Sequence, residues 1–182
     1  GARVTVVEMA ESLLPGMDAD LGQELGKAFA KQGLRVLPGH RFERCELVEG
    51  GAVVTVAGPK GTEALQAERV LVAVGRSARI EGMGLEALGV SLERGRIPVD
   101  ATMRTRVPWI SAIGDLVGPL QLAHAASEQG VLAAEAIAGR HEGGTVVDAT
   151  RIPLCVYCQP EVAAVGLTEA QANWRAHPAH PS

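Results

Sequence analysis

The chain has 182 residues, of which 47% are hydrophobic, and 17 basic against 21 acidic side chains give a formal net charge of −4 at pH 7. This composition is typical of a folded globular protein, and the balanced charge provides no basic surface for nucleic acid or an anionic membrane. No apolar run reaches the roughly 18 residues of a membrane span, and three cysteines are too few for a disulfide framework, so we expect a cytoplasmic protein.

A β-branched run at residues 3–7 predicts a central strand, and Glu8 follows at its carboxyl end. In Rossmann-type folds an acid at this position accepts a hydrogen bond from the adenosine ribose 2′-hydroxyl, and its charge repels a 2′-phosphate. The glycine-rich turn that precedes such a strand does not occur in the sequence, so we expect the chain to be a piece of a longer protein. By itself, Glu8 is either an acid that selects NAD or an ordinary strand-end acid.

A capped helix is expected after this strand. Asp18 or Asp20 is placed to cap the first turn, the helix is predicted over residues 21–32, and Gly33 is a suitable residue to end it. A short strand at residues 34–37 then completes a strand–helix–strand unit, which favours an α/β fold.

The next segments predict a small antiparallel meander. Three stretches, at residues 42–47, 52–56 and 64–66, alternate weakly around Gly-rich turns. The apolar run at residues 69–74 then predicts another buried strand, which Gly75 closes on the ligand side.

A second candidate site follows an apolar run at residues 109–113, which predicts a short buried strand. Gly114 allows a close backbone turn, and Asp115 leaves a carboxylate where ligands of open α/β sheets bind. A helix is predicted over residues 122–138, with its first N–H groups facing the same ligand. Taken alone, Asp115 either accepts hydrogen bonds from a sugar-like hydroxyl chain or only caps a turn.

Four separated motifs carry a family resemblance. They are VAVGR at 72–76, TMRTRVPWISAIGD at 102–115, LAHAASEQG at 122–130 and IPLCVYCQPEVAAVGLTE at 152–169. In this order they resemble the second half of the FAD-dependent pyridine nucleotide–disulfide oxidoreductases. The resemblance extends from Gly1 to about Ala172, and the third motif is most similar to the branch of the family that oxidises dihydrolipoyl dithiols.

The resemblance implies two cofactors, FAD and NAD. In the family, the acid at the position of Asp115 holds the ribityl chain of FAD, the turn and helix start at residues 121–124 lie against the flavin ring, and the glycine at the position of Gly75 lies against NAD. Glu8 is then expected to select NAD over NADP. The expected cofactor-binding residues are Glu8, Gly75, Gly114, Asp115, Gln121, Leu122, Ala123 and His124.

The resemblance also implies the fold class and the domains. We expect an α/β chain made of a Rossmann-like NAD domain with a meander, the second half of an FAD domain, and the start of an α+β dimerisation domain. The expected boundaries are residues 1–77, 78–148 and 149–182, with a Gly-rich connector at 139–148.

Two strands and a helix are predicted in the last of these domains. The strands are expected at residues 151–157 and 161–166, and Thr168 opens the helix. After Ala172 the sequence departs from the family, and two prolines within residues 173–182 argue against a continued helix.

No catalytic residue and no metal site are expected in this chain. In the family the redox cysteines lie in a Cys-x-x-x-x-Cys segment and a His-Glu pair handles protons, and neither motif occurs here. Cys155 and Cys158 have the spacing of a redox or zinc pair, but a strand places them on opposite faces and a second pair for metal is absent. His177 and His180 do not match the catalytic-histidine motif.

The resemblance therefore implies that the intact protein oxidises a dihydrolipoyl dithiol through a disulfide and FAD and reduces NAD to NADH, whereas this chain alone is inactive. The expected partners are the lipoyl group on an acyltransferase or carrier protein of a 2-oxo acid dehydrogenase complex, and a second copy of the protein. Two alternatives stay open: another FAD-dependent NAD(P)-disulfide reductase, such as a mercuric reductase, and a non-catalytic NAD-binding module.

Overall fold

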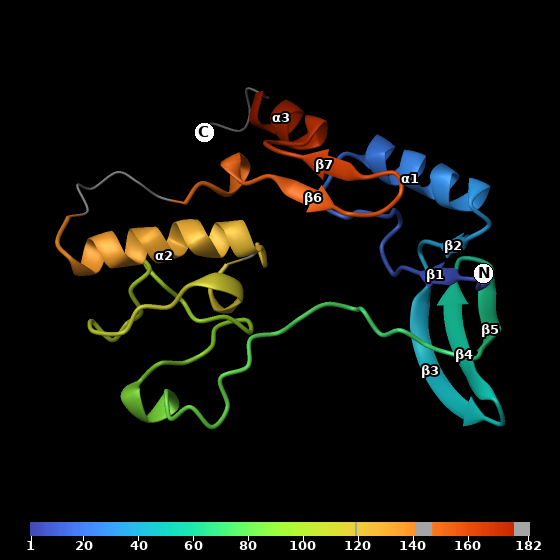
Figure 1. Ribbon diagram of the computed structural model, residues 1–182, viewed down its shortest axis with the longest axis horizontal. Helices are drawn as coiled ribbons and strands as arrows, with labels where there is room; N and C mark the ends of the chain where they lie inside the picture. Colours follow the sequence, from blue (N-terminus) through green and yellow to red (C-terminus); the bar gives the residue numbers. More distant parts are fainter. Residues whose placement is uncertain (119, 141–146, 177–182) are drawn as a thin grey trace. The chain divides into compact units, whose positions relative to one another are not determined.

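The computed structural model describes residues 1–118, 120–140 and 147–176 (Figure 1). The described residues form two compact units, one built from Gly1–Ala73 with the described part of Pro153–Ser182, and the other from Val74–Ile152. Helices and strands occur together in the chain, so the predicted α/β class is confirmed.

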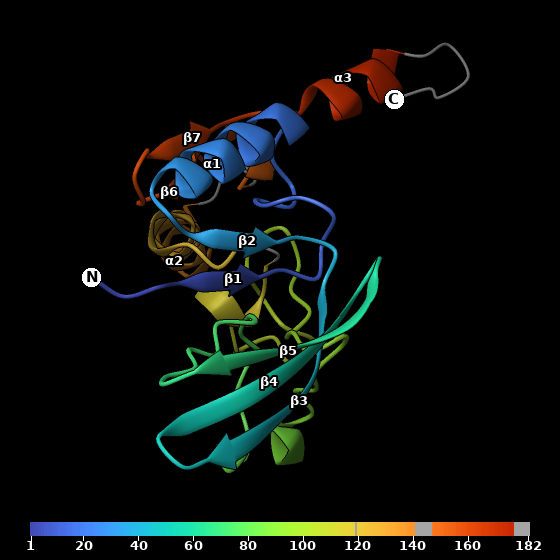
Figure 2. The same cartoon turned by 90° about the vertical axis from the view of Figure 1, so that its right-hand side faces the viewer.

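The first unit begins with the predicted strand–helix–strand arrangement. β1 (Thr5–Val7) and β2 (Arg35–Leu37) pair in parallel, and α1 (Ala19–Lys31) connects them and packs against β2. Figure 2 shows α1 running along one face of the pair. Gly33 follows α1 with a φ of +83°, a left-handed conformation that glycine adopts without strain, so its predicted role in ending the helix is confirmed.

Side chains at both ends of α1 bind the C-terminal segment of the same unit. Asp18 is the N-cap residue of α1, but its Oδ1 accepts a hydrogen bond from the Glu169 N–H, at 2.8 Å, instead of capping α1. At the other end, Gln32 Nε2 donates a hydrogen bond of 2.6 Å to the carbonyl of Gln159. The α1 helix therefore fixes two points of the segment that begins at Pro153.

The predicted meander is confirmed, and its strands are longer than expected. β3 (Arg41–Val48), β4 (Gly51–Gly58) and β5 (Gly61–Ala67) form an antiparallel sheet in the order β3-β4-β5. The central strand β4 carries the buried side chains of this sheet, including Val56 with no exposed surface, whereas β3 is exposed along its whole length.

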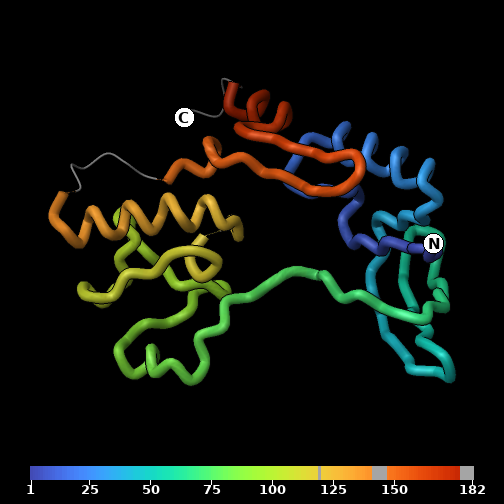
Figure 3. Tube along the Cα trace, in the orientation of Figure 1, coloured from blue at the N-terminus to red at the C-terminus, as the bar shows by residue number. Residues whose placement is uncertain are grey.

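The predicted buried strand at residues 69–74 is wrong. These residues form no strand, and their apolar side chains are exposed, with Leu71 and Val74 each 90% exposed. Figure 3 shows the segment as an extended trace. A buried strand needs hydrogen-bonded neighbours, and β1 and β2, the parallel strands among the described residues, pair only with each other.

The C-terminal part of the first unit is a hairpin followed by a helix. β6 (Leu154–Val156) pairs antiparallel with β7 (Val162–Ala164), so both predicted strands exist but are shorter than expected. The strand predicted from residue 151 begins late because the short 3₁₀ helix η3 (Ala149–Arg151) precedes it in the chain.

The last helix, α3 (Glu169–Ala176), opens at Thr168 as predicted. Thr168 Oγ1 accepts a hydrogen bond from the Gln171 N–H, and Gln171 Oε1 accepts one from the Thr168 N–H, which is a capping box. The expectation that the helix stops after Ala172 is wrong, because the two prolines lie beyond residue 176. His177 and His180 lie outside the described residues, as does most of the predicted connector at 139–148.

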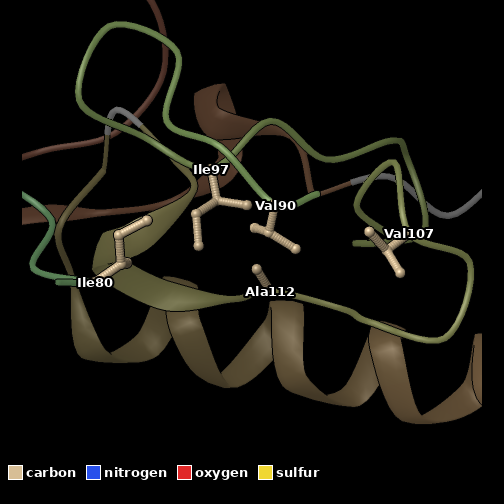
Figure 4. Close-up of a cluster of buried hydrophobic side chains, with 5 residues drawn as sticks. All are labelled: Ile80, Val90, Ile97, Val107 and Ala112. Atoms are coloured by element: carbon tan, nitrogen blue, oxygen red, sulfur yellow. The ribbon is translucent and has the colours of Figure 1, made fainter. Parts of the chain in front are cut away.

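The second unit has its core among loops rather than within a sheet. Figure 4 shows the buried side chains of Ile80, Val90, Ile97, Val107 and Ala112 gathered in one cluster. These residues come from well-separated positions in the chain, on either side of the 3₁₀ helix η1 (Glu86–Leu88). Loop packing therefore supports the site described below.

The predicted strand at residues 109–113 is also wrong. Val107 to Ile110 form a turn, closed by a hydrogen bond of 2.9 Å from the Ile110 N–H to the Val107 carbonyl, and Trp109 on this turn is 82% exposed. The Thr105 hydroxyl donates to the Ile110 carbonyl as well. The segment turns back at Pro108 instead of extending, and only Ser111 forms an isolated bridge, with Arg104.

The predicted helix at 122–138 is confirmed as α2 (Ala123–Ile137). Near the end of this helix, Arg104 donates from Nη2 to the Ala136 carbonyl at 3.3 Å. The Ala136 carbonyl also accepts from the Gly139 N–H, so the cation adds a second hydrogen bond there and stabilises the negative dipole at the end of α2. None of the helices in the described residues is long and apolar enough to cross a membrane.

Candidate functional site

The Gly114-Asp115 pair begins a tight turn, the 3₁₀ helix η2 (Gly114–Leu116). Gly114 has a φ of +76°, so the turn requires the left-handed conformation that glycine provides. The Val117 N–H donates to the Gly114 carbonyl at 3.0 Å, and the Ile97 N–H donates to the Leu116 carbonyl at 2.8 Å. The turn is therefore anchored to the core, although it follows an irregular segment rather than the predicted strand.

A buried glutamine on α2 completes this turn. Gln129 is only 7% exposed, and its Oε1 accepts a hydrogen bond of 2.7 Å from the Gly114 N–H. The sequence analysis missed Gln129. A signal was present, because Gln129 lies at helical spacing between the buried Ala125 and Leu132 and is the polar member of that buried face.

Small residues let α2 and the turn approach closely. A β-carbon added to Gly114 would lie 3.5 Å from the Ala126 β-carbon, and one added to Gly130 would lie 3.4 Å from Ile113 Cδ1. Larger side chains at these positions would push the turn off the helix. The motif LAHAASEQG thus supplies both the close packing and the buried acceptor.

The carboxylate of Asp115 faces a cation. Arg76 Nε lies 3.5 Å from Asp115 Oδ2, and the two side chains are 76% and 43% exposed. Arg76 directly follows Gly75, whose φ of +117° again requires glycine. The structure therefore brings two of the predicted motifs, Gly75-Arg76 and Gly114-Asp115, together in one unit.

The start of α2 presents backbone N–H groups without a side-chain cap. Leu122 is the N-cap residue, has an extended backbone and makes no side-chain cap hydrogen bond. Gln121, Ala123 and His124 are exposed, and Leu122 is half-buried. The positive end of the helix dipole favours a polar or anionic ligand.

Glu8 lies in the first unit, directly after β1. Its N–H donates to the Leu37 carbonyl at 3.0 Å and its carbonyl accepts from the His40 N–H at 2.9 Å, so its backbone continues the contact with β2. Its Oε1 accepts a hydrogen bond of 2.7 Å from the Ala10 N–H. One carboxylate oxygen thus builds the local turn, while Oε2 has no hydrogen bond within the described part of the chain.

The first unit also contains an open cavity of about 330 Å³ that does not include Glu8. Two charged residues at its edge form a bidentate ion pair, because Arg35 donates to both carboxylate oxygens of Glu63 at 2.7 and 2.8 Å. This hydrogen bonding raises the pKa of Arg35 and lowers the pKa of Glu63. The lining residues are Arg35, Leu37, His40, Pro59, Lys60, Gly61, Thr62 and Glu63.

Cys155 and Cys158 are free thiols. Cys155 is exposed on β6, and Cys158 lies beyond the end of that strand, where its Sγ donates to the Pro160 carbonyl at 3.1 Å. Within the described ranges, no group of three or more His, Cys, Asp or Glu side chains is arranged to hold a metal ion.

Comparison with known proteins identifies close sequence relatives. A family model described as pyridine nucleotide-disulphide oxidoreductase matches residues 1–130. The dihydrolipoyl dehydrogenase of Corynebacterium glutamicum is 44% identical over 178 residues, and that of Mycobacterium tuberculosis is 46% identical over 176 residues. Each match covers 95% of this chain but 37% of the relative, so the chain spans little more than a third of the length of these proteins.

Solved structures are similar as well. LpdA from Mycobacterium tuberculosis matches with a TM-score of 0.85 and 31% identity, over 98% of this chain and 38% of that chain. The HOCl-induced flavoprotein disulfide reductase RclA from Escherichia coli matches with a TM-score of 0.81 and 26% identity, over 97% of this chain and 40% of that chain.

Proposed function

Because the chain belongs to the pyridine nucleotide-disulphide oxidoreductase family, as its motifs indicated, we propose that the intact protein oxidises a dihydrolipoyl dithiol and reduces NAD to NADH. FAD and NAD are the cofactors of dihydrolipoyl dehydrogenases. The two dihydrolipoyl dehydrogenases described above are both more than 40% identical to the chain. The observation that carries the proposal is the Gly114-Asp115 turn, which α2 and the loop core hold with its carboxylate half exposed.

The residues around this turn fit the ribityl chain of FAD. Asp115 provides a carboxylate that accepts hydrogen bonds from hydroxyl groups, and Gly114 leaves space that a β-carbon would partly fill. The start of α2, with Gln121, Leu122, Ala123 and His124, forms the adjoining surface for the flavin. When bound, FAD supplies the electron-transfer chemistry, and these residues supply position and polarity.

The residues around β1 fit the adenosine half of NAD. Glu8 keeps Oε2 as an acceptor for a ribose 2′-hydroxyl, and its negative charge disfavours the 2′-phosphate of NADP. Gly75 gives the backbone close approach to the nicotinamide nucleotide, as in the family motif that it matches. Both assignments are part of the proposal.

The domain organisation follows from the same proposal. Residues 1–77 belong to the NAD domain, residues 78–148 to the second half of the FAD domain, and residues 149–182 to the start of the dimerisation domain. The intact protein is then a cytoplasmic homodimer that receives electrons from a lipoyl group on an acyltransferase or carrier protein of a 2-oxo acid dehydrogenase complex.

A different disulfide reductase, such as a mercuric reductase, is the main alternative. Sequence identity supports the dihydrolipoyl substrate, since the two dihydrolipoyl dehydrogenases described above are 44% and 46% identical to the chain. The remaining alternative, a non-catalytic NAD-binding module, predicts NAD binding without dithiol oxidation.

The test uses the complete protein encoded by the gene. We expect it to bind FAD and to form NADH from NAD and dihydrolipoamide, measured by absorbance, while Hg²⁺ reduction with NADPH stays absent. The 182-residue chain alone is expected to form no NADH, because its three cysteines include no Cys-x-x-x-x-Cys pair. NADH formation by the isolated chain that is lost in a Cys155→Ser/Cys158→Ser variant would contradict this assignment of the redox site.

A further inference from the structure

The buried Gln129 makes a contact that the proposed function does not yet use. Its Oε1 lies 2.7 Å from the Gly114 nitrogen, and a β-carbon on Gly118 would lie 3.5 Å from its Nε2. The carboxamide is therefore seated against both ends of the turn that carries Asp115. Because Gly114 N–H is a donor, the oxygen of the carboxamide must face it.

The turn is costly to form without this partner. Gly114 adopts a left-handed backbone, and its N–H donates to Gln129 on α2. A half-buried N–H without an acceptor is unfavourable, and the segment could avoid that cost by unwinding the turn. Unwinding would change the direction in which Asp115 points.

The geometry points to Gln129 as a positioning residue for FAD: its carboxamide fixes the left-handed Gly114, and thereby orients the carboxylate of Asp115 toward the ribityl hydroxyls. This inference rests on the proposed function, because it concerns how the proposed FAD site is held. Gln129 itself has 7% exposure and lies behind the turn, so it acts through Asp115 rather than by touching the ligand.

An oxygen acceptor suits this position, because the Gly114 N–H donates to it. A glutamate in its place also accepts a hydrogen bond from Gly114, whereas methionine has a similar length and shape but offers only a weak acceptor. The two variants therefore separate the hydrogen bond from the space that the side chain fills.

The experiment measures FAD binding to the apo form of the complete protein by flavin fluorescence, for Gln129→Met and Gln129→Glu. We expect Gln129→Met to weaken FAD affinity by about tenfold to a hundredfold, the loss typical of an unsatisfied buried donor, and Gln129→Glu to restore most of it. The visible circular dichroism of bound flavin is expected to change in Gln129→Met and to return toward wild type in Gln129→Glu.

Leu132→Ala is the control for a general loss of stability. Leu132 is 3% exposed, lies on the same helix in a buried cluster with Met103 and Ala133, and has an apolar side chain that makes no hydrogen bond to the turn. This variant is expected to lower the Tm at least as much as Gln129→Met while leaving FAD affinity within about threefold of wild type, a difference that corresponds to less than 1 kcal/mol by the standard conversion. If Leu132→Ala and Gln129→Met weaken FAD binding equally, Gln129 acts only on stability and the inference is wrong.

A double-mutant cycle with Asp115→Ala distinguishes the two levels of the proposal. If Gln129 acts through Asp115, the double variant binds FAD about as weakly as Asp115→Ala alone. If Asp115→Ala weakens FAD but Gln129→Met does not, the inference fails and the FAD site stands. If the wild-type protein binds no FAD, the proposed function fails first and the inference falls with it.

Discussion

The two candidate cofactor acids, Glu8 and Asp115, lie in turns that are built in opposite ways. The Glu8 carboxylate builds its own turn, because Oε1 accepts a hydrogen bond from the Ala10 N–H two residues later. The Asp115 turn is built by a different residue, since Gln129 accepts the Gly114 N–H from across the unit. Asp115 therefore keeps its whole carboxylate for a charged or hydroxylated partner, at present Arg76.

This difference separates what each acid does for folding from what it does for binding. Removing the Glu8 side chain should disturb both its turn and any ligand contact, whereas removing the Asp115 side chain leaves the hydrogen bonds of its turn in place. The following predictions, for the complete protein, test this contrast in order of decreasing expected effect.

Asp115→Ala is expected to weaken FAD binding by roughly 1–3 kcal/mol, because it removes an acceptor that buried flavin hydroxyls need. The Tm of the apo protein is expected to change little, since no backbone hydrogen bond of the turn depends on this side chain. FAD retained after gel filtration is the measurement, and Glu135→Ala, an exposed acid on α2, is the control. Unchanged FAD retention would show that Asp115 is not a ligand.

Glu8→Ala is expected to narrow the preference for NAD over NADP by about tenfold to a hundredfold and also to lower stability. Glu8→Gln sharpens the test, because its amide oxygen still accepts from the Ala10 N–H while the negative charge is lost. Specificity constants for both cofactors, measured together with Tm, should show that Gln restores stability but not the preference. If both variants keep the wild-type preference for NAD over NADP, a residue other than Glu8 recognises the ribose.

Gly114→Ala is expected to destabilise the protein by about 1–2 kcal/mol, the cost of a left-handed conformation for a residue with a β-carbon. The added methyl group has room, since the nearest atom lies 3.5 Å away, so the cost is conformational. Gly26→Ala on α1 is the matched control. Nothing lies within 4 Å of its added methyl group, and this change should instead stabilise the protein by roughly 0.5–1 kcal/mol. Urea unfolding measures the free energy of unfolding of both variants. A change of the same sign in both would contradict the role assigned to the left-handed φ of Gly114.

Arg76→Gln is expected to have the smallest effect, at most about 1 kcal/mol on stability, because the ion pair with Asp115 is largely exposed. Salt screens such a pair, so the difference from wild type should disappear at high ionic strength. Urea unfolding at low and high salt measures this effect, and titrations of FAD binding under the same conditions show whether Arg76 also affects the cofactor. A large effect that persists at high salt would mean that Arg76 contacts the cofactor directly.

The sequence predicted the elements whose signals are local. Helices α1 and α2, the meander and the start of α3 depend on caps, glycine turns and alternation within a few residues, and all were found near their expected positions. The close turn at Gly114 was predicted for the same reason, because glycine is the residue that allows such a turn, and the structure shows it in the left-handed conformation.

The failures concern apolar runs that need distant partners. Residues 69–74 and 109–113 have the composition of buried strands, but composition does not specify which strand pairs with them. The same limit applies to the site, because the Gly114 N–H donates to Gln129, 15 residues away, and the Ala136 carbonyl at the end of α2 accepts from Arg104, 32 residues away. Such contacts form when distant parts of the chain pack together, and a pattern of neighbouring residues in the sequence does not predict them.

The hydrogen bonds at the two ends of α1 make the length of this helix a constraint on insertions. Asp18 holds Glu169 and Gln32 holds Gln159, so about 20 Å of helix sets the separation between two points in the C-terminal segment. Adding one helical turn would move these points about 5 Å further apart, and both bonds could not then form without stretching the hairpin of β6 and β7. Homologous sequences should therefore vary in length at the exposed Glu49-Gly50 turn of the meander and keep a constant spacing through α1.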